Sequence, residues 1–209
     1  MMIGIFGGTF DPVHYGHLRT ALDVQQALSL TQVRFIPCGE PPHRNKPVAD
    51  PLQRLAMVRA AIAGQANFVV DDREIQRGGA SYMVDTLASL KKDFTSETLC
   101  LMLGADAFNG LPQWHCWQEI FSLANIVVMQ RPGDSSISAQ HPALSSVLKQ
   151  RLISAEDLHT KTHGAICRVA VTQLAISASA IREQWQQGKD IRFYTPDAVL
   201  TLIRQQKIY

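Results

Sequence analysis

Six short apolar runs, rich in β-branched residues, recur along the chain and are mostly separated by segments of helical periodicity. Runs of this length and composition are typical of buried strands. Parallel strands need crossover connections and bury both faces, so this alternation favours a parallel sheet covered by helices. The sequence therefore predicts a doubly wound α/β fold with a mainly parallel sheet. The expected strands are residues 2–6, 32–37, 67–71, 98–103, 125–129 and 165–171.

Three of the intervening segments carry clear helical signals. Residues 15–28 place Leu18, Leu22 and Leu28 at helical spacing. Asp50 followed by Pro51 is a good cap and first-turn pair for a helix over residues 52–63. Residues 81–94 also read as a helix. In such sheets ligands bind beyond the carboxyl ends of the strands, so the loop after residue 6 lies at the edge of the sheet where a ligand is expected.

Length, charge and cysteine usage exclude several classes of protein. The 209 residues, 46% of them hydrophobic, are enough for one compact domain, which we expect to span residues 1–209. A net charge of +2, without any block of like charge, is not a nucleic-acid footprint. The four cysteines are widely spaced and show no CxxC pair, which fits a reducing cytoplasm. No stretch approaches a membrane span or a signal-peptide core, so a soluble protein is expected.

The segment MIGIFGGTFDPVHYGH, residues 2–17, joins the first strand to a helix through a glycine-rich loop. Gly7 and Gly8 are expected to let the backbone turn tightly and approach a ligand. The helix N-terminus after Pro12 favours an anion such as phosphate. His14 and His17, three residues apart, then share one helical face. Both imidazoles are therefore expected to meet the same anion.

Other interpretations of this loop are weaker. The glycines could serve only the turn, with two histidines exposed by chance. A zinc site would need a third ligand, and no cysteine or acidic residue lies at familiar metal spacing nearby. The phosphate-binding patterns GxxxxGK[ST] and GxGxxG do not occur in the chain.

A second segment, Ile176-Ser177-Ala178-Ser179-Ala180-Ile181-Arg182, follows the last expected strand. Ser177 or Ser179 can cap a helix there, and Ser179 and Arg182 share a face of its first turn. Arg182 would bring a fixed charge and a planar donor fork to phosphates. Taken alone, the segment is better explained as a capped surface helix.

Two stretches are expected to be loops. Residues 38–47 contain three prolines and the basic His43, Arg44 and Lys46, and they could form a mobile lid over phosphates or an ordinary solvated loop. Residues 132–142 contain three serines, one glycine and two prolines.

Together, the GGTFDPVHYGH and ISASAIR segments resemble the two signatures of the nucleotidyltransferase superfamily with paired histidines. Within it, the chain is most similar, almost end to end, to the nicotinate mononucleotide adenylyltransferases. That similarity also rests on the groups Pro41-Pro42-His43-Arg44, Gly79-Ala80-Ser81-Tyr82, Asp85-Thr86-Leu87, Gly104-Ala105-Asp106, Trp114-His115, Arg131-Pro132-Gly133 and Tyr194 with Pro196. The resemblance implies a Rossmann-like fold in which the helical part from about residue 176 packs on the same domain.

The resemblance also implies a site. ATP would be bound by Gly7, Gly8, Thr9, Phe10, His43, Ile176, Ser177 and Ser179, with His14, His17 and Arg182 catalytic. The mononucleotide would contact Tyr82, Met83, Gly104, Asp106, Trp114, His115 and Arg131. In this assignment Trp114 stacks on the pyridine, Gly104 to Asp106 meet the ribose, and amides near Met83 and His115 hold the nicotinate carboxylate.

Some of these residues have simpler structural interpretations. Trp114, Trp117 and Phe121 could be one packed face of a short helix. Asp106 could be only a helix cap, although a carboxylate at a strand's carboxyl end suits a ribose hydroxyl. Met83 departs from the family, which usually has threonine there, so any hydroxyl contribution is lost.

The expected reaction is direct adenylyl transfer from ATP to nicotinate mononucleotide, with release of pyrophosphate and no enzyme nucleophile. Mg²⁺ would be held mainly by ATP, and no protein metal site is expected. A bound triphosphate should favour the charged form of the histidines. Alternatives are a nicotinamide mononucleotide or phosphopantetheine adenylyltransferase, or a non-catalytic adenylate-binding module. The oligomeric state is not readable from the sequence.

Overall fold

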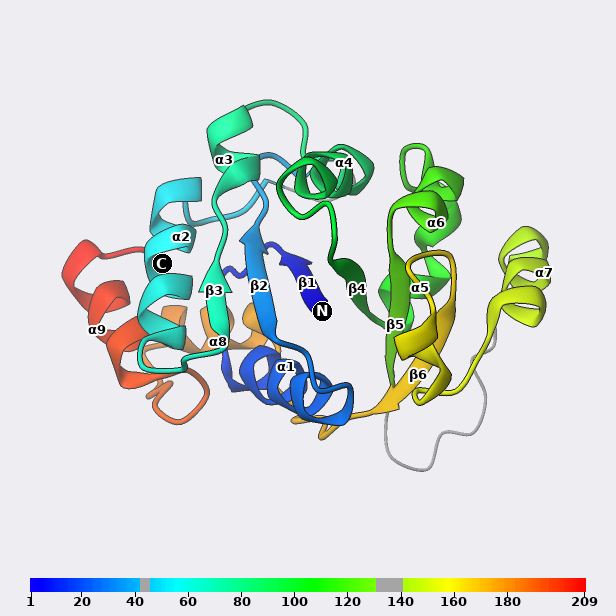
Figure 1. The fold of residues 1–209 in the computed structure, drawn as a ribbon. Helices are drawn as coiled ribbons and strands as arrows, with labels where there is room; N and C mark the ends of the chain where they lie inside the picture. The colour runs from blue at the N-terminus through cyan, green and yellow to red at the C-terminus, as the bar shows by residue number, and fades with distance from the viewer. Residues whose placement is uncertain (42–45, 131–140) are drawn as a thin grey trace.

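The computed structural model of the chain describes residues 1–41, 46–130 and 141–209 (Figure 1). Its centre is a six-stranded sheet in the order β3-β2-β1-β4-β5-β6, in which every pair of neighbouring strands is parallel. This confirms the predicted doubly wound α/β fold. The strands are β1 Met2–Gly8, β2 Gln32–Pro37, β3 Phe68–Val70, β4 Thr98–Gly104, β5 Asn125–Gln130 and β6 Ile166–Ala170.

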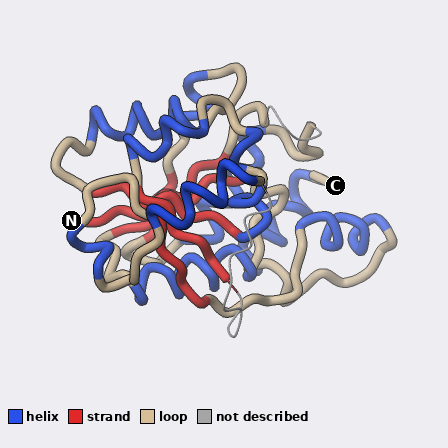
Figure 2. The backbone as a smooth tube through the Cα atoms, turned by 90° about the vertical axis from the view of Figure 1, so that its right-hand side faces the viewer, coloured by secondary structure: helices blue, strands red, loops and turns tan. Residues whose placement is uncertain are grey.

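Helices cover both faces of this sheet, which lies in the middle of the molecule (Figure 2). The three helices expected from periodicity are present as α1, α2 and α4, and α2 begins at the predicted Asp50-Pro51 cap. Short or weakly amphipathic helices such as α3 and α7 were not foreseen. The α-helices are α1 Tyr15–Ala27, α2 Pro51–Ile62, α3 Arg73–Arg77, α4 Met83–Asp93, α5 Ala105–Asn109, α6 Ile120–Leu123, α7 Pro142–Arg151, α8 Ala178–Gln186 and α9 Asp197–Gln206. The 3-10 helices are η1 Leu111–Gln113, η2 Trp117–Glu119 and η3 Asp157–Thr160.

The sheet separates two hydrophobic cores because successive strand residues point to opposite faces. Along β1, Met2 and Phe6 enter the core shared with α1, α2, α8 and α9, whereas Ile3 and Ile5 enter the core shared with α4, α5, α6 and α7. The strands of the sheet centre are buried on both sides, and this explains their continuous apolar composition.

The C-terminal part of the chain packs against the first of these cores. Ile181 of α8 and Val199, Leu200 and Ile203 of α9 are buried in it. In Figure 1 α9 lies alongside α2, with which it is in contact. Residues far apart in the sequence are thereby brought beside the N-terminal loop.

The strand order reverses direction between β1 and β4, so the carboxyl ends of these two strands form the switch point of the sheet. Open α/β sheets bind ligands in the crevice at this point. Among the described residues, no helix combines the length and the hydropathy that crossing a membrane requires.

Candidate active site

The first strand continues two residues further than predicted and includes Gly7 and Gly8, which pair with Ile36 and Pro37. The expected tight turn at these glycines is therefore wrong, because neither has a positive φ. Their small size serves packing instead. A Cβ at Gly7 would lie 2.6 Å from Cε of Met83, and one at Gly8 would lie 2.9 Å from the Phe10 ring.

The turn itself follows at Phe10, which has a φ of 51° and a buried side chain. Its ring meets the His17 ring edge-on, with 5.1 Å between centroids. The carbonyl of the preceding residue, Thr9, accepts a hydrogen bond from Nη1 of Arg54 at 2.9 Å. The loop is thus fixed by the buried Phe10 ring and by the buried guanidinium of Arg54.

The two motif histidines, which the three-residue spacing predicted on one helical face, form a stacked pair at the start of α1. His14 precedes α1 as its N-cap, and His17 lies in the first turn. Their ring centroids are 3.7 Å apart and their planes are inclined by 27°. The backbone N–H of His14 donates to Nδ1 of His17 at 3.3 Å. This bond directs the remaining nitrogen of His17, Nε2, away from the helix backbone.

Burial determines the charge of this pair in the free protein. It lowers the pKa of His14 to about 4. Burial, and then the proximity of His14, lower the pKa of His17 well below its ordinary value. Both rings are therefore neutral at neutral pH. Nδ1 of His14 is buried and has no hydrogen-bond partner among the described residues.

Gly16 lies between the histidines for a steric reason. A Cβ at this position would be 2.9 Å from both Nδ1 and Cε1 of the His14 ring. Any larger residue would displace that ring from its stack on His17. Thr20, one turn further along α1, donates its hydroxyl to the Gly16 carbonyl at 2.9 Å.

The second motif reaches the same loop from the other end of the chain. Ser177 is the N-cap of α8 and accepts from the backbone N–H of Ala180 at 3.2 Å, so the cap falls on the first of the two candidate serines. Arg182 extends from the first half of α8 and donates from Nη1 to the main-chain carbonyl of Asp11. Its guanidinium also lies 3.6 Å from Oδ2 of Asp11. The two motifs therefore converge, as expected for a shared phosphate site.

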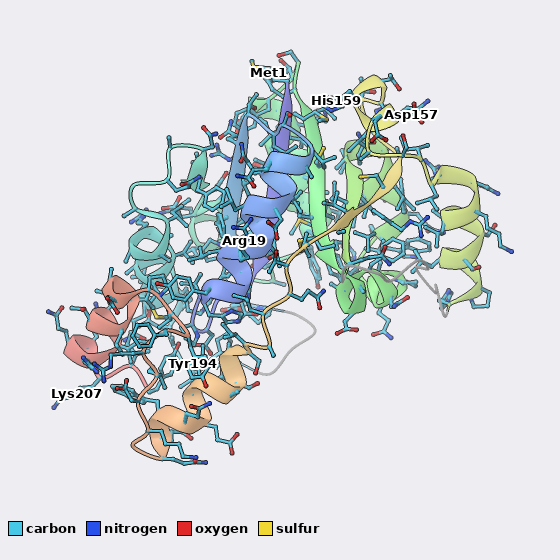
Figure 3. The ribbon with its side chains drawn as sticks, turned by 90° about the horizontal axis from the view of Figure 1, so that it is seen from below. Met1, Arg19, Asp157, His159, Tyr194 and Lys207 are labelled. Atoms are coloured by element: carbon cyan, nitrogen blue, oxygen red, sulfur yellow. The ribbon has the colours of Figure 1, made fainter. Side chains whose placement is uncertain are left out.

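The segment before α9 also makes hydrogen bonds to the end of the N-terminal loop and the start of α1. Oγ1 of Thr195 donates to the carbonyl of Val13 at 2.8 Å, and the backbone N–H of Tyr15 donates to the carbonyl of Tyr194 at 3.0 Å. Figure 3 shows Tyr194 between the start of α1 and the C-terminal helices. The N-terminus of α1 is thus held by one side-chain and one backbone hydrogen bond from a distant part of the chain.

A cavity of about 270 Å³ opens beside the histidine pair, at the carboxyl ends of β1, β4, β5 and β6. Imidazoles and a helix N-terminus form one side, and apolar side chains form another, which suits a ligand with an anionic and an aromatic part. Its lining includes the predicted residues His14, His17, Gly104 and Ile176, together with Phe6, Gly16, Thr20, Met129, Val171, Gln173 and Leu174.

Several predicted mononucleotide residues lie at the same edge of the sheet. Tyr82, the N-cap of α4, packs its ring against that of His115 with 4.4 Å between centroids. Met83 begins α4 and is next to Gly7, so the α4 N-terminus adjoins the end of β1. Gly104 ends β4 and caps α5. The structure therefore connects Tyr82 with His115, Met83 with the end of β1, and Gly104 with the cavity beside the histidines.

Two simpler interpretations of these residues are wrong. Asp106 does not cap α5, because the N-cap is Gly104, and its side chain is exposed in the first turn. Trp114 does not share one helix with Trp117 and Phe121, because the three lie after η1, in η2 and in α6. All three pack against the second core, and Trp114 remains partly exposed. The predicted residues His43 and Arg131 lie outside the described residues, as do residues 42–45 of the first expected loop and residues 132–140 of the second.

Sequence reasoning missed two buried polar residues that shape the site. Asp11 is 4% exposed and joins the loop to three other segments. Arg54 is 1% exposed and donates to the carbonyls of Thr9, Gly39 and Ala49. A signal existed for Arg54: it shares the buried stripe of α2 with Val58 and Ile62, at four-residue spacing. In the described ranges, no three His, Cys, Asp or Glu side chains come together as a metal site.

The chain belongs to the cytidylyltransferase-like family, whose model matches residues 5–184. Within it, the chain is 49% identical to a probable nicotinate-nucleotide adenylyltransferase of Methylococcus capsulatus, over 100% of this chain and 99% of that protein. It is 44% identical to the protein of the same description from Pseudomonas fluorescens, over 99% and 96% of the two chains.

Solved structures support the fold. The nicotinic acid mononucleotide adenylyltransferase of Plasmodium falciparum, solved with NaAD, aligns with a TM-score of 0.74 at 17% identity, over 99% of this chain and 96% of that one. The same enzyme solved with APC gives a TM-score of 0.73 over the same shares.

Proposed function

We infer that this protein transfers the adenylyl group of ATP to nicotinate mononucleotide, giving nicotinate adenine dinucleotide and pyrophosphate. The full-length relatives at 44% to 49% identity carry this activity in their descriptions. The observation in the structure that supports it best is the meeting of Arg182 with the Asp11 loop, beside the stacked histidines. Two segments separated by most of the chain thereby supply one anion site.

The proposed roles follow from the arrangement of these groups. His14 is assigned to the α-phosphate of ATP, and His17 and Arg182 to the β- and γ-phosphates. The backbone amides of Gly8, Thr9 and Phe10 are assigned to the phosphate cradle. The apolar part of the cavity, which includes Ile176, is assigned to the adenosine. Ser177 caps the helix that carries Arg182, and Ser179 is proposed to face the phosphates beside it.

The chemistry needs no nucleophile from the protein. A 5′-phosphate is already anionic, so its oxygen attacks the α-phosphorus, the bond to the β-phosphate oxygen breaks, and pyrophosphate leaves with that electron pair. The protein's contribution is to align the two phosphates and to stabilise charge on the oxygens. Protonation of a histidine would strengthen this stabilisation, because a nearby phosphate opposes the effect of burial on its pKa.

Mg²⁺ is proposed to enter with ATP and to neutralise phosphate charge. This fits the site, because the described residues beside the histidines offer donors for anions rather than a group of carboxylates for a cation.

The mononucleotide is proposed to lie across the carboxyl end of β4. Tyr82, Met83, His115 and Trp114 would surround the pyridine and its carboxylate, and Gly104 and Asp106 would meet the ribose. The contact between the rings of Tyr82 and His115 supports this placement, because it forms an aromatic surface against which a pyridine can pack. His43 and Arg131 keep their predicted roles as proposals. The reaction is proposed to take place in the cytoplasm, where a reducing environment keeps the four cysteines free.

The test is a pyrophosphate-release assay with ATP and each of three acceptors: nicotinate mononucleotide, nicotinamide mononucleotide and phosphopantetheine. We expect the highest kcat/KM for nicotinate mononucleotide. Equal values for the acid and the amide would contradict the acid preference. Binding of ATP without pyrophosphate release on any acceptor would instead indicate a non-catalytic adenylate-binding protein.

A further inference from the structure

The Asp11 carboxylate is buried, and both of its oxygens accept hydrogen bonds from other segments of the chain. Oδ2 accepts from the backbone N–H of Val48 at 2.8 Å, and Oδ1 accepts from that of Ala49 at 3.2 Å. Oδ1 also accepts from the hydroxyl of Tyr209 at 2.8 Å. A carboxylate with hydrogen bonds on both oxygens has a fixed orientation.

The same residue holds Arg182. The guanidinium of Arg182 donates to the Asp11 carbonyl and lies 3.6 Å from Oδ2, whereas Tyr209 bonds to Oδ1. The side chain of Arg182 is 25% exposed, so it is partly open to a ligand while its position is set from within the protein.

Tyr209 is itself fixed by the helix that carries Arg182. Nε1 of Trp185, three residues after Arg182 on α8, donates to the main-chain oxygen of Tyr209 at 3.0 Å. A closed ring of contacts thus runs from Arg182 to Asp11, on to Tyr209, and back to α8 through Trp185. Burial, and then the Asp11 carboxylate, raise the pKa of the Tyr209 phenol, so that it remains a hydrogen-bond donor.

We propose that Tyr209 is a positioning residue for Arg182: its hydroxyl holds the Asp11 carboxylate in the orientation that keeps the Arg182 guanidinium at the phosphate loop. This rests on the proposed role of Arg182 at the β- and γ-phosphates. A guanidinium already in place loses less side-chain freedom when the triphosphate arrives, and this favours both binding and alignment. None of the residues proposed for the acceptor mononucleotide belongs to this ring of contacts.

The test is Tyr209→Phe, which removes only the hydroxyl. Tyr194→Phe is the matched control, because the contact of Tyr194 with α1 uses its backbone carbonyl. We expect Tyr209→Phe to lower kcat and to weaken binding of inorganic pyrophosphate, each by about tenfold, which is within the range of coupled pairs. The KM for nicotinate mononucleotide should stay within about twofold of wild type, a split that general destabilisation does not produce. Tyr194→Phe should match the wild type.

A double-mutant cycle with Arg182→Ala separates positioning from a structural role. If Tyr209 acts through Arg182, Tyr209→Phe has no further effect on pyrophosphate binding or kcat in the Arg182→Ala background. An equal loss in both backgrounds would overturn the proposal and leave Tyr209 a purely structural residue. A loss of less than about tenfold for Arg182→Ala alone would instead overturn the phosphate role of Arg182. The two failures are therefore distinguishable.

Discussion

The imidazole rings of His14 and His17 are stacked with their centroids 3.7 Å apart. Two charged rings at this distance in a buried site would repel each other, so the free protein keeps them neutral. A triphosphate would supply the missing counter-charge. The pair is therefore a site whose protonation is coupled both to folding and to ligand binding, and the first two predictions follow from this coupling.

We expect the protein to lose stability as the pH falls below about 6.5. Unfolded histidine titrates near that value, whereas the pKa of His14 in the folded protein is about 4, so the unfolded state binds the proton first. His14 alone should account for about 2 kcal/mol of the free energy of unfolding between pH 7 and pH 5. Urea unfolding across this range should show a smaller loss for His14→Gln. An unchanged pH dependence in that variant would contradict the lowered pKa.

ATP binding should take up protons. Phosphate oxygens near His14 and His17 raise the pKa of an imidazole that burial had lowered, with uptake of up to about one proton at pH 6. Titration calorimetry in buffers of different ionisation enthalpy measures this number directly. His17→Gln should reduce it, and a binding enthalpy that is independent of the buffer would contradict the proposed contact.

Gly16→Ala should impair ATP use without unfolding the protein. The new Cβ forces the His14 ring away from its stack, since 2.9 Å is too close for a carbon contact. Alanine also favours the helix by about 1 kcal/mol, so the free energy of unfolding should change little. We expect kcat/KM for ATP to fall at least about tenfold. Gly110→Ala is the control, because its Cβ would meet nothing closer than 3.5 Å. Equal kinetics of the two variants would rule out the steric role of Gly16.

Arg54→Met should destabilise the protein far more than Arg59→Met on the same helix. The first change leaves the carbonyls of Thr9, Gly39 and Ala49 without their buried donor, at a cost of about 3 kcal/mol or more. The second removes only a solvent-exposed ion pair with Asp72, worth less than about 1 kcal/mol. Because Arg54 holds the Thr9 carbonyl, a rise in the KM for ATP should accompany the loss. Comparable urea midpoints would show that this contact does not stabilise the loop.

Much of the fold was predictable from local patterns. All six strands lie where apolar runs predicted them, with ends shifted by at most two residues, because buried parallel strands need continuous apolar sequence. The short helix α3 and the late helix α9 escaped prediction. The five residues of α3 are too few for a periodic signal, whereas α9 carries one in Val199, Leu200 and Ile203 that the prediction missed. The error at Gly7 and Gly8 has a related cause, since glycine is required there by neighbours that local sequence does not reveal.

The sequence by itself determined the alternating architecture, the helix that begins beside the histidines and the pair of motifs that identify the family, because these depend on short-range spacing. Only the tertiary structure decided that Arg182 meets Asp11, that Tyr209 completes the junction and that Arg54 lies beneath the loop. The physical reason is that a buried polar group must find its partner wherever the folded chain provides one, and these partners are up to 198 residues away.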